Sequence, residues 1–183
     1  DSGVGGITVL KELKRALPTE SFIYLGDTAR LPYGPKPTDM VRGFADEIAH
    51  TLLQREVKAV VVACNTASAA ALATLRHRYP ETPFVGMVPA VKPAAAVTQS
   101  GVVGVLATPA TYHGRLYQDV VDQFGREVQV LSSVCPGLVE RIEEGDLDGP
   151  QTIALLRRCL EPILAAGADT LVLGCTHYPF VIP

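Results

Sequence analysis

Two cysteines stand at the ends of apolar runs that have the length of buried strands. Cys64 lies in VVVACNTAS (60–68), and Cys175 lies in LVLGCTHYP (171–179). Both cysteines are followed at once by hydrogen-bonding residues, which are Asn65, Thr66, Thr176 and His177. A thiol can act as a nucleophile, as a metal ligand or as a carrier of protons. The repeated arrangement predicts that the two cysteines share one function.

The spacing of the two cysteines does not favour a metal site or a redox site. Structural zinc sites and disulfide oxidoreductases use closely spaced C-x-x-C pairs, whereas here 175 − 64 = 111 positions separate the two thiols. A cysteine hydrolase needs one nucleophile and leaves the second motif unexplained. Two thiols on opposed surfaces can instead remove a proton from one face of a carbon and deliver one to the other. The alternative is that each cysteine is a small apolar residue in a strand.

Apolar runs of strand length alternate with segments of helical periodicity, which is typical of parallel sheets covered by helices. Strands are predicted at 22–26, 57–63, 84–88, 102–107, 128–132 and 169–174, and helices at 7–16, 39–54, 66–78, 110–124, 137–144 and 151–165. The expected fold class is therefore α/β. Both cysteines fall at carboxyl ends of strands, where parallel sheets bind ligands. Cys64 also precedes a helix, whose free N–H groups stabilise a thiolate.

The stretch VGMVPAVKPAAAV (85–97) divides the chain into two parts. Proline among small residues favours a connection between two sheets, so we predict a first domain at 1–90 and a second at 91–183. Cys64 then falls in the first domain and Cys175 in the second. The chain starts in DSGVGG, a turn of the kind that follows a strand, and stops soon after its last strand. We expect a first strand before this turn and a further segment after Pro183.

Composition indicates a well-buried globular protein. The 183 residues are 48% apolar and 19% charged, and the net charge of −3 provides no general attraction for nucleic acid or an anionic membrane. No apolar run approaches the roughly 18 residues of a spanning helix. Four cysteines do not resemble a secreted disulfide framework. We therefore expect reduced thiols, a cytoplasmic protein and no nucleic-acid or membrane partner.

Five stretches carry a resemblance to a known family. DSGVGG, YLGDTARLPYG, ACNTASA, GVLATPAT and LVLGCTHYPF, in this order, resemble the aspartate/glutamate racemase family over essentially the whole chain. The resemblance implies two pseudo-symmetric α/β domains facing each other across a cleft that holds the active site. It also implies inversion of the α-carbon of glutamate by two cysteines, with no cofactor and no metal. The product, D-glutamate, would enter peptidoglycan. A homodimer is left open.

The resemblance also implies roles for single residues. Cys64 matches the thiol that deprotonates D-glutamate, and Cys175 matches the thiol that deprotonates L-glutamate. Asp1 matches a carboxylate that supports the first thiol, while His177 supports the second. Glu143 matches an acidic residue near the second thiol, with an exposed helix charge as the alternative. The positions that match substrate-holding residues are Ser2, Tyr33, Gly34, Asn65, Thr66, Thr108, Thr111 and Thr176.

Other interpretations of the same residues stay open. A racemase or isomerase of the same superfamily could act on aspartate or another small acid. A non-catalytic module that binds carboxylates would leave the two thiols incidental. The remaining cysteines, Cys135 and Cys159, are predicted to be packing residues, because one precedes a proline and the other lies on the apolar face of a helix.

Overall fold

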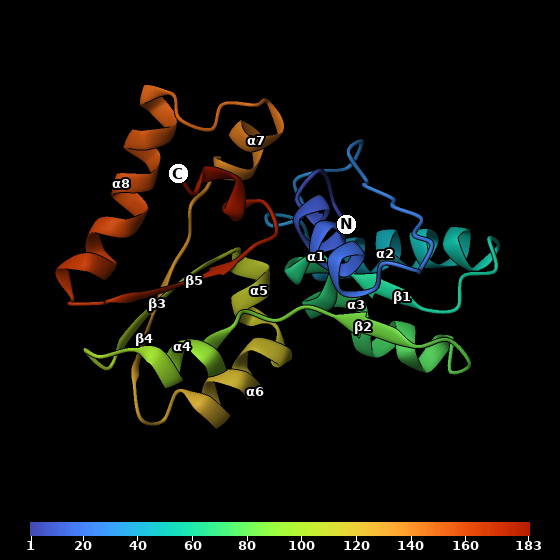
Figure 1. Cartoon of the computed structure of the whole chain (residues 1–183), viewed down its shortest axis with the longest axis horizontal. Coiled ribbons are helices and arrows are strands. Elements are labelled where there is room, and N and C mark those ends of the chain that lie inside the picture. The colour runs from blue at the N-terminus through green and yellow to red at the C-terminus, as the bar shows by residue number, and fades with distance from the viewer.

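Two separate parallel sheets organise the protein, for which a computed structural model describes residues 1–183 (Figure 1). In the first sheet, β1 (Val60–Val62) pairs with β2 (Phe84–Gly86). In the second, β3 (Val102–Ala107) lies between β4 (Gln129–Ser133) and β5 (Thr170–Gly174). Every pairing is parallel. The predicted α/β class, with two sheets flanked by helices, is confirmed.

The structure also has eight α-helices and one 3₁₀ helix. They are α1 (Gly6–Ala16), α2 (Thr38–Leu53), α3 (Asn65–Arg78), α4 (Val91–Val97), α5 (Pro109–His113), α6 (Arg115–Phe124), α7 (Leu138–Glu143), α8 (Pro150–Ala165) and η1 (Tyr178–Val181). The sequence predicted one helix at 110–124, but Gly114 has extended backbone angles and separates α5 from α6. The sequence also missed α4, because Pro93 looked like a breaker. Pro93 lies in the first turn, where a missing N–H costs nothing.

The predicted strand at 22–26 is wrong. Residues 22–26 form no strand in the structure. Asp1 donates its amino group to Leu25 O at 2.9 Å and accepts the backbone N–H of Asp27 at 2.9 Å. The apolar FIYL run has the propensity of a strand, yet a strand also requires a partner over several residues.

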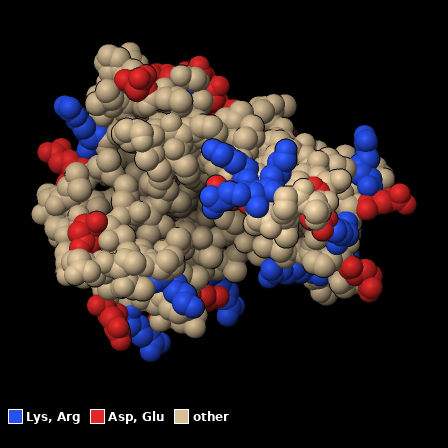
Figure 2. Space-filling model, viewed as in Figure 1, with Lys and Arg blue, Asp and Glu red and all other residues tan.

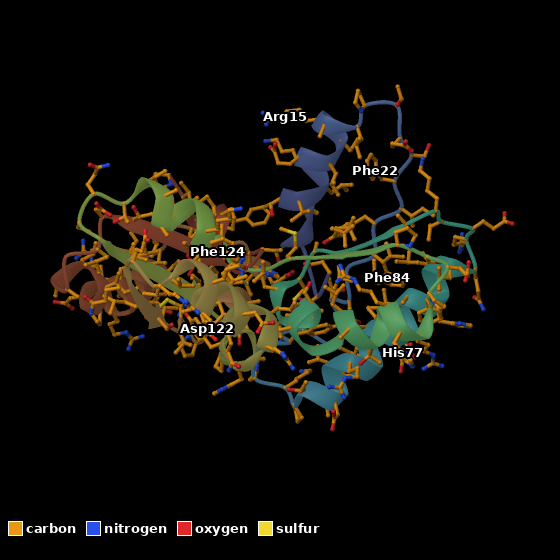
Figure 3. All side chains as sticks on the ribbon, turned by 90° about the horizontal axis from the view of Figure 1, so that it is seen from below. Arg15, Phe22, His77, Phe84, Asp122 and Phe124 are labelled. Carbon is orange, nitrogen blue, oxygen red and sulfur yellow. A yellow bond between two sulfur atoms is a disulfide. The ribbon has the colours of Figure 1, made fainter.

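Each sheet has its own apolar core. Phe84 packs with Leu72 and Leu75 between the first sheet and α3 (Figure 3). On the second sheet, Val91 of α4 packs with Val103 of β3. Residues from α4 onward therefore contribute to the core of the second sheet. The division into domains at residue 90 stays a prediction.

Cys135 and Cys159 are joined by a disulfide, with Cα atoms 5.6 Å apart. The expectation that both thiols are reduced was wrong, whereas the prediction that both are packing residues agrees with their burial in the core of the second sheet. Cys135 follows β4, and Cys159 lies on α8, which packs beside that strand. A separation of 24 residues gives no indication that the two meet. Cys64 and Cys175 are the two free cysteines.

We predict opposite effects of alanine at two glycines. At Gly104 in β3, an added Cβ would lie 2.3 Å from Cγ2 of Ile163, so Gly104→Ala should destabilise the fold by about 1–3 kcal/mol. At Gly43, inside α2, an added Cβ meets nothing, so Gly43→Ala should stabilise it by about 0.5–1 kcal/mol. Urea unfolding of both variants measures the difference. Equal stabilities would contradict the tight packing of α8 on β3.

Candidate active site

The two free thiols line one cavity between the two sheets. The cavity has a volume of about 300 Å³ and includes both Cys64 and Cys175 in its wall. Cys64 comes two residues after the end of β1, and Cys175 directly follows β5. This common cavity at the carboxyl ends of two strands is the placement that the sequence predicts. The other predicted residues in its wall are Ser2, Tyr33, Gly34, Thr66, Thr108 and His177.

Cys64 is the N-cap of α3. Its backbone is extended, and its Sγ accepts the backbone N–H of Ala67 at 3.4 Å. The alanine-rich sequence that follows, NTASAAALATLRHR, has a high intrinsic preference for helix. A thiolate at this position would face free N–H groups and the positive end of the helix dipole. The sulfur of Cys64 therefore lies at the N-terminus of α3.

Cys175 lies in a different environment. Burial raises the pKa of its thiol to about 12, and the backbone N–H groups of His177 and Tyr178 oppose this shift only in part. The thiol is therefore neutral near pH 7. Its Sγ lies 3.9 Å from Nδ1 of His177, a side chain that is 1% exposed. The imidazole of His177 therefore lies beside the thiol of Cys175.

Glu143 holds the imidazole from its other side. Its Oε1 lies 2.5 Å from Nε2 of His177 and accepts the backbone N–H of Val4 at 2.7 Å. A carboxylate at this distance requires a proton on Nε2, which leaves Nδ1 free to face Cys175. The side chain of Glu143 is only 11% exposed. The alternative reading of Glu143 as an exposed helix charge is therefore wrong.

The carboxylate of Asp1 contacts the second cysteine motif. It accepts the backbone N–H of Gly3 and the hydroxyl of Thr176, each at 3.1 Å. Asp1 makes no hydrogen bond to Cys64 in this structure, so its support of that thiol stays a prediction. Through Thr176, Asp1 ties the loop of residues 1–6 to the strand end that carries Cys175.

Three buried threonine hydroxyls from both halves of the chain form a cluster, and two of the residues, Thr66 and Thr108, line the cavity. Thr66 Oγ1 lies 2.8 Å from that of Thr108 and 3.5 Å from that of Thr111, and the last two are 3.0 Å apart. Thr108 is the N-cap of α5 and accepts the N–H of Thr111. Asn65, the first residue of α3, is also buried. Hydroxyls and free N–H groups at two helix starts can hold carboxylate oxygens.

Asp27, which is 7% exposed, was not predicted from the sequence as a site residue. Asp27 accepts the hydroxyl of Tyr33 at 2.5 Å and Nε of Arg30 at 2.7 Å, and so fixes the ring of Tyr33 in the cavity wall. The spacing in GDTARLPYG, with arginine three and tyrosine six residues after the aspartate, could have indicated this cluster. Apolar wall residues such as Val134 and Val139 gave no signal.

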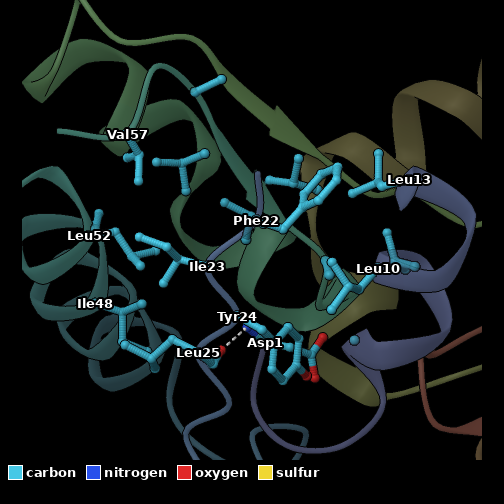
Figure 4. Close-up of a pocket in the computed structure, with 18 of the residues that line it drawn as sticks. Asp1, Leu10, Leu13, Phe22, Ile23, Tyr24, Leu25, Ile48, Leu52 and Val57 are labelled. Atoms are coloured by element: carbon cyan, nitrogen blue, oxygen red, sulfur yellow. Dashed lines mark hydrogen bonds between the residues drawn. The ribbon is translucent and has the colours of Figure 1, made fainter. Parts of the chain in front are cut away.

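A second cavity, of about 650 Å³, is larger but lacks the pair of free cysteines. It is a mainly apolar groove between α1, residues 22–25, α2 and β1 (Figure 4). Leu10, Leu13 and Leu52 line it, and neither free cysteine does. We therefore assign the chemistry to the smaller cavity between the sheets.

Charged side chains of both signs are spread over the molecular face seen in Figure 2. The basic group near the middle of this view lies over α1, which carries Lys11, Lys14 and Arg15. No helix of the structure is both long enough and apolar enough to cross a membrane.

Comparison with known proteins decides the family. Residues 5–182 match the family model described as Asp/Glu/hydantoin racemase. The chain belongs to this family. A glutamate racemase from Roseiflexus sp. (strain RS-1) is 61% identical over the whole chain, which spans 67% of that relative. These matches make the protein an amino-acid racemase.

Solved structures of racemases have the same fold. The glutamate racemase isoform RacE1 from Bacillus anthracis matches with a TM-score of 0.89 and 40% identity, covering 99% of this chain and 68% of that one. The Escherichia coli glutamate racemase, in complex with L-glutamate and the activator UDP-MurNAc-ala, matches with a TM-score of 0.88 and 36% identity. That match covers 100% of this chain and 72% of the other.

We predict an order of thiol modification. With iodoacetamide at pH 7.5, Cys64 should react before Cys175, because the raised pKa of Cys175 keeps that thiol protonated. The rate at Cys175 should rise about tenfold per pH unit between pH 7 and 9. Cys135 and Cys159 should not react before reduction, and glutamate should protect both free thiols. Peptide mapping by mass spectrometry gives the order, and faster labelling of Cys175 would contradict the assigned environments.

Proposed function

We propose that the protein interconverts L- and D-glutamate by proton transfer between Cys64 and Cys175. The observation that carries the proposal is that both free thiols line one cavity, at carboxyl ends of strands from different sheets. Glutamate as substrate is taken from the names of the relatives. The two-thiol step is an inference from the arrangement of the site.

From L-glutamate, the reaction begins at Cys175. His177 Nδ1 takes the proton of the thiol, which gives a thiolate beside an imidazolium that Glu143 stabilises. The thiolate then removes the α-proton, and the electron pair of the C–H bond stays on the α-carbon. Cys64, as a thiol, donates its proton to the opposite face and becomes a thiolate. The reverse sequence converts D-glutamate to L-glutamate.

The difficult intermediate is the carbanion, because the neighbouring carboxylate disfavours negative charge on the α-carbon. We assign the hydroxyls of Thr66, Thr108 and Thr111 to the carboxylate oxygens of the substrate, where added charge would accumulate. Preorganised donors in a cavity that excludes water stabilise such charge far more than water does. This chemistry needs no cofactor. The proposed cellular role is to supply D-glutamate for peptidoglycan.

The two thiols are activated by different groups. Cys64 lies at the N-terminus of α3, whereas Cys175 lies beside His177, which is bonded to Glu143. A helix terminus acts as a fixed partial charge, while an imidazole can carry a proton away. The Cys175 step should therefore depend on the hydrogen bonds around His177, and the Cys64 step should not.

We predict that neither thiol can be replaced. Cys64→Ala and Cys175→Ala should each lower racemisation by at least about 10³-fold, because one face of the α-carbon loses its acid or base. Circular dichroism of wild type and variants measures the change in optical activity, with L-glutamate and L-aspartate as parallel substrates. Thr51→Ala, at an exposed position of α2 outside the cavity wall, serves as the control.

Two results would contradict the proposal. Full racemisation by either alanine variant would show that one thiol suffices. Inversion of aspartate by the wild-type protein, with none of glutamate, would place the protein with the alternative substrate.

A further inference from the structure

Tyr24 contacts the loop that joins the two halves of the site. Its ring lines the larger cavity beside Asp1 (Figure 4), and the side chain is 36% exposed overall. Its hydroxyl, however, points into the loop of residues 1–6 and donates a hydrogen bond to the carbonyl oxygen of Gly3. Space for the hydroxyl depends on Gly6, where an added Cβ would lie 2.8 Å from it.

The peptide unit that accepts this bond also donates one. The carbonyl of Gly3 and the N–H of Val4 belong to the same peptide group, and that N–H donates to Oε1 of Glu143 at 2.7 Å. This peptide group lies in close contact with Glu143, because a Cβ added at Gly3 would lie 1.8 Å from Oε1 of Glu143. Hydrogen bonds in a chain polarise one another, so donation to a carbonyl makes the N–H of the same peptide a stronger donor.

We propose that Tyr24 is a positioning residue for the Cys175 half of the reaction, acting through the Gly3–Val4 peptide, Glu143 and His177. The series of hydrogen bonds runs from the Tyr24 hydroxyl to the Gly3–Val4 peptide, and from the N–H of Val4 to Glu143. From there it runs to Nε2 of His177 at 2.5 Å, whose Nδ1 faces Cys175. Tyr24 touches none of the reacting atoms. The inference rests on the proposed function, because it assigns Tyr24 to one of the two proposed proton transfers.

The phenol is suited to this role because it keeps its proton. Burial raises the pKa of Tyr24 to about 12, and the negative charge of Glu143 adds to the shift. Tyr24 therefore donates throughout the pH range of an assay. Removing its hydroxyl leaves the Gly3 carbonyl without this donor, weakens the N–H that holds Glu143, and loosens the orientation of His177. No hydrogen bond joins Cys64 to this series of hydrogen-bonded groups.

Tyr24→Phe tests the inference with a loss of one oxygen atom. We expect kcat/KM for glutamate to fall about three- to tenfold, as for the loss of one hydrogen bond. The fall must be equal in both directions, since L- and D-glutamate have the same free energy and share one highest transition state. The rates alone therefore cannot say which proton transfer is affected.

Primary isotope effects with substrate deuterated at the α-carbon separate the two transfers. In L-glutamate this bond breaks at Cys175, so a slower Cys175 step should make its isotope effect larger in Tyr24→Phe than in wild type. In D-glutamate the bond breaks at Cys64, so its isotope effect should become smaller. A variant that is only less stable, or binds substrate less well, would leave both isotope effects unchanged.

A double-mutant cycle tests the route through Glu143. If Tyr24 acts through that carboxylate, adding Tyr24→Phe to Glu143→Gln should change kcat/KM by less than about twofold. Tyr79→Phe is the matched control, because it also removes a hydroxyl that is bonded within the first half, to Asp46, and neither of these two residues lines the cavity. It should leave the rates and both isotope effects unchanged.

The outcomes are distinguishable. Unchanged rates, a parallel change in both isotope effects, or full additivity with Glu143→Gln would each overturn the role of Tyr24 while leaving the racemase proposal intact. Absence of glutamate racemisation in the wild-type protein would instead overturn the proposed function. Urea unfolding of each variant shows whether it is folded under assay conditions.

Discussion

Burial of the Cys175 thiol is the constraint on which the rest of the site depends. A dry cavity is needed to stabilise charge at the α-carbon, but the same burial raises the pKa of Cys175 from its ordinary 9.0 to about 12. This shift favours the neutral thiol by about 4 kcal/mol. Without help, only about one Cys175 in 10⁵ would be a thiolate at pH 7. The imidazole of His177 and the carboxylate of Glu143 lie where they can offset this cost.

The fold satisfies this constraint by bringing two strand ends and one loop together. Cys64 and Cys175 reach the same cavity because both sheets are parallel and their carboxyl ends face it. The loop of residues 1–6 then spans the two halves. The N–H of Val4 donates a hydrogen bond to Glu143, and the carboxylate of Asp1 accepts one from the hydroxyl of Thr176. Opening of the two halves would break both bonds.

Local sequence patterns predicted much of this arrangement. Apolar runs ending in cysteine identified both strand ends, and the helix after Cys64 followed from its alanine-rich composition. Contacts between distant residues were not predictable in the same way. The bond from Val4 to Glu143 joins residues 139 apart, and the Tyr24 contact depends on a bend in the loop. The prediction of a strand at 22–26 was wrong for the same reason, because the β-propensity of a segment does not show whether a neighbouring strand pairs with it.

The central claim is that two separate thiols serve the two faces of the α-carbon. Racemisation in deuterated water, stopped at low conversion, tests it most directly. The account predicts that product formed from either enantiomer carries solvent deuterium, while recovered substrate keeps its original proton. A single base would return the substrate's own proton to the product and exchange deuterium into the substrate. Abundant deuterium in recovered substrate, with protium in the product, would contradict the account.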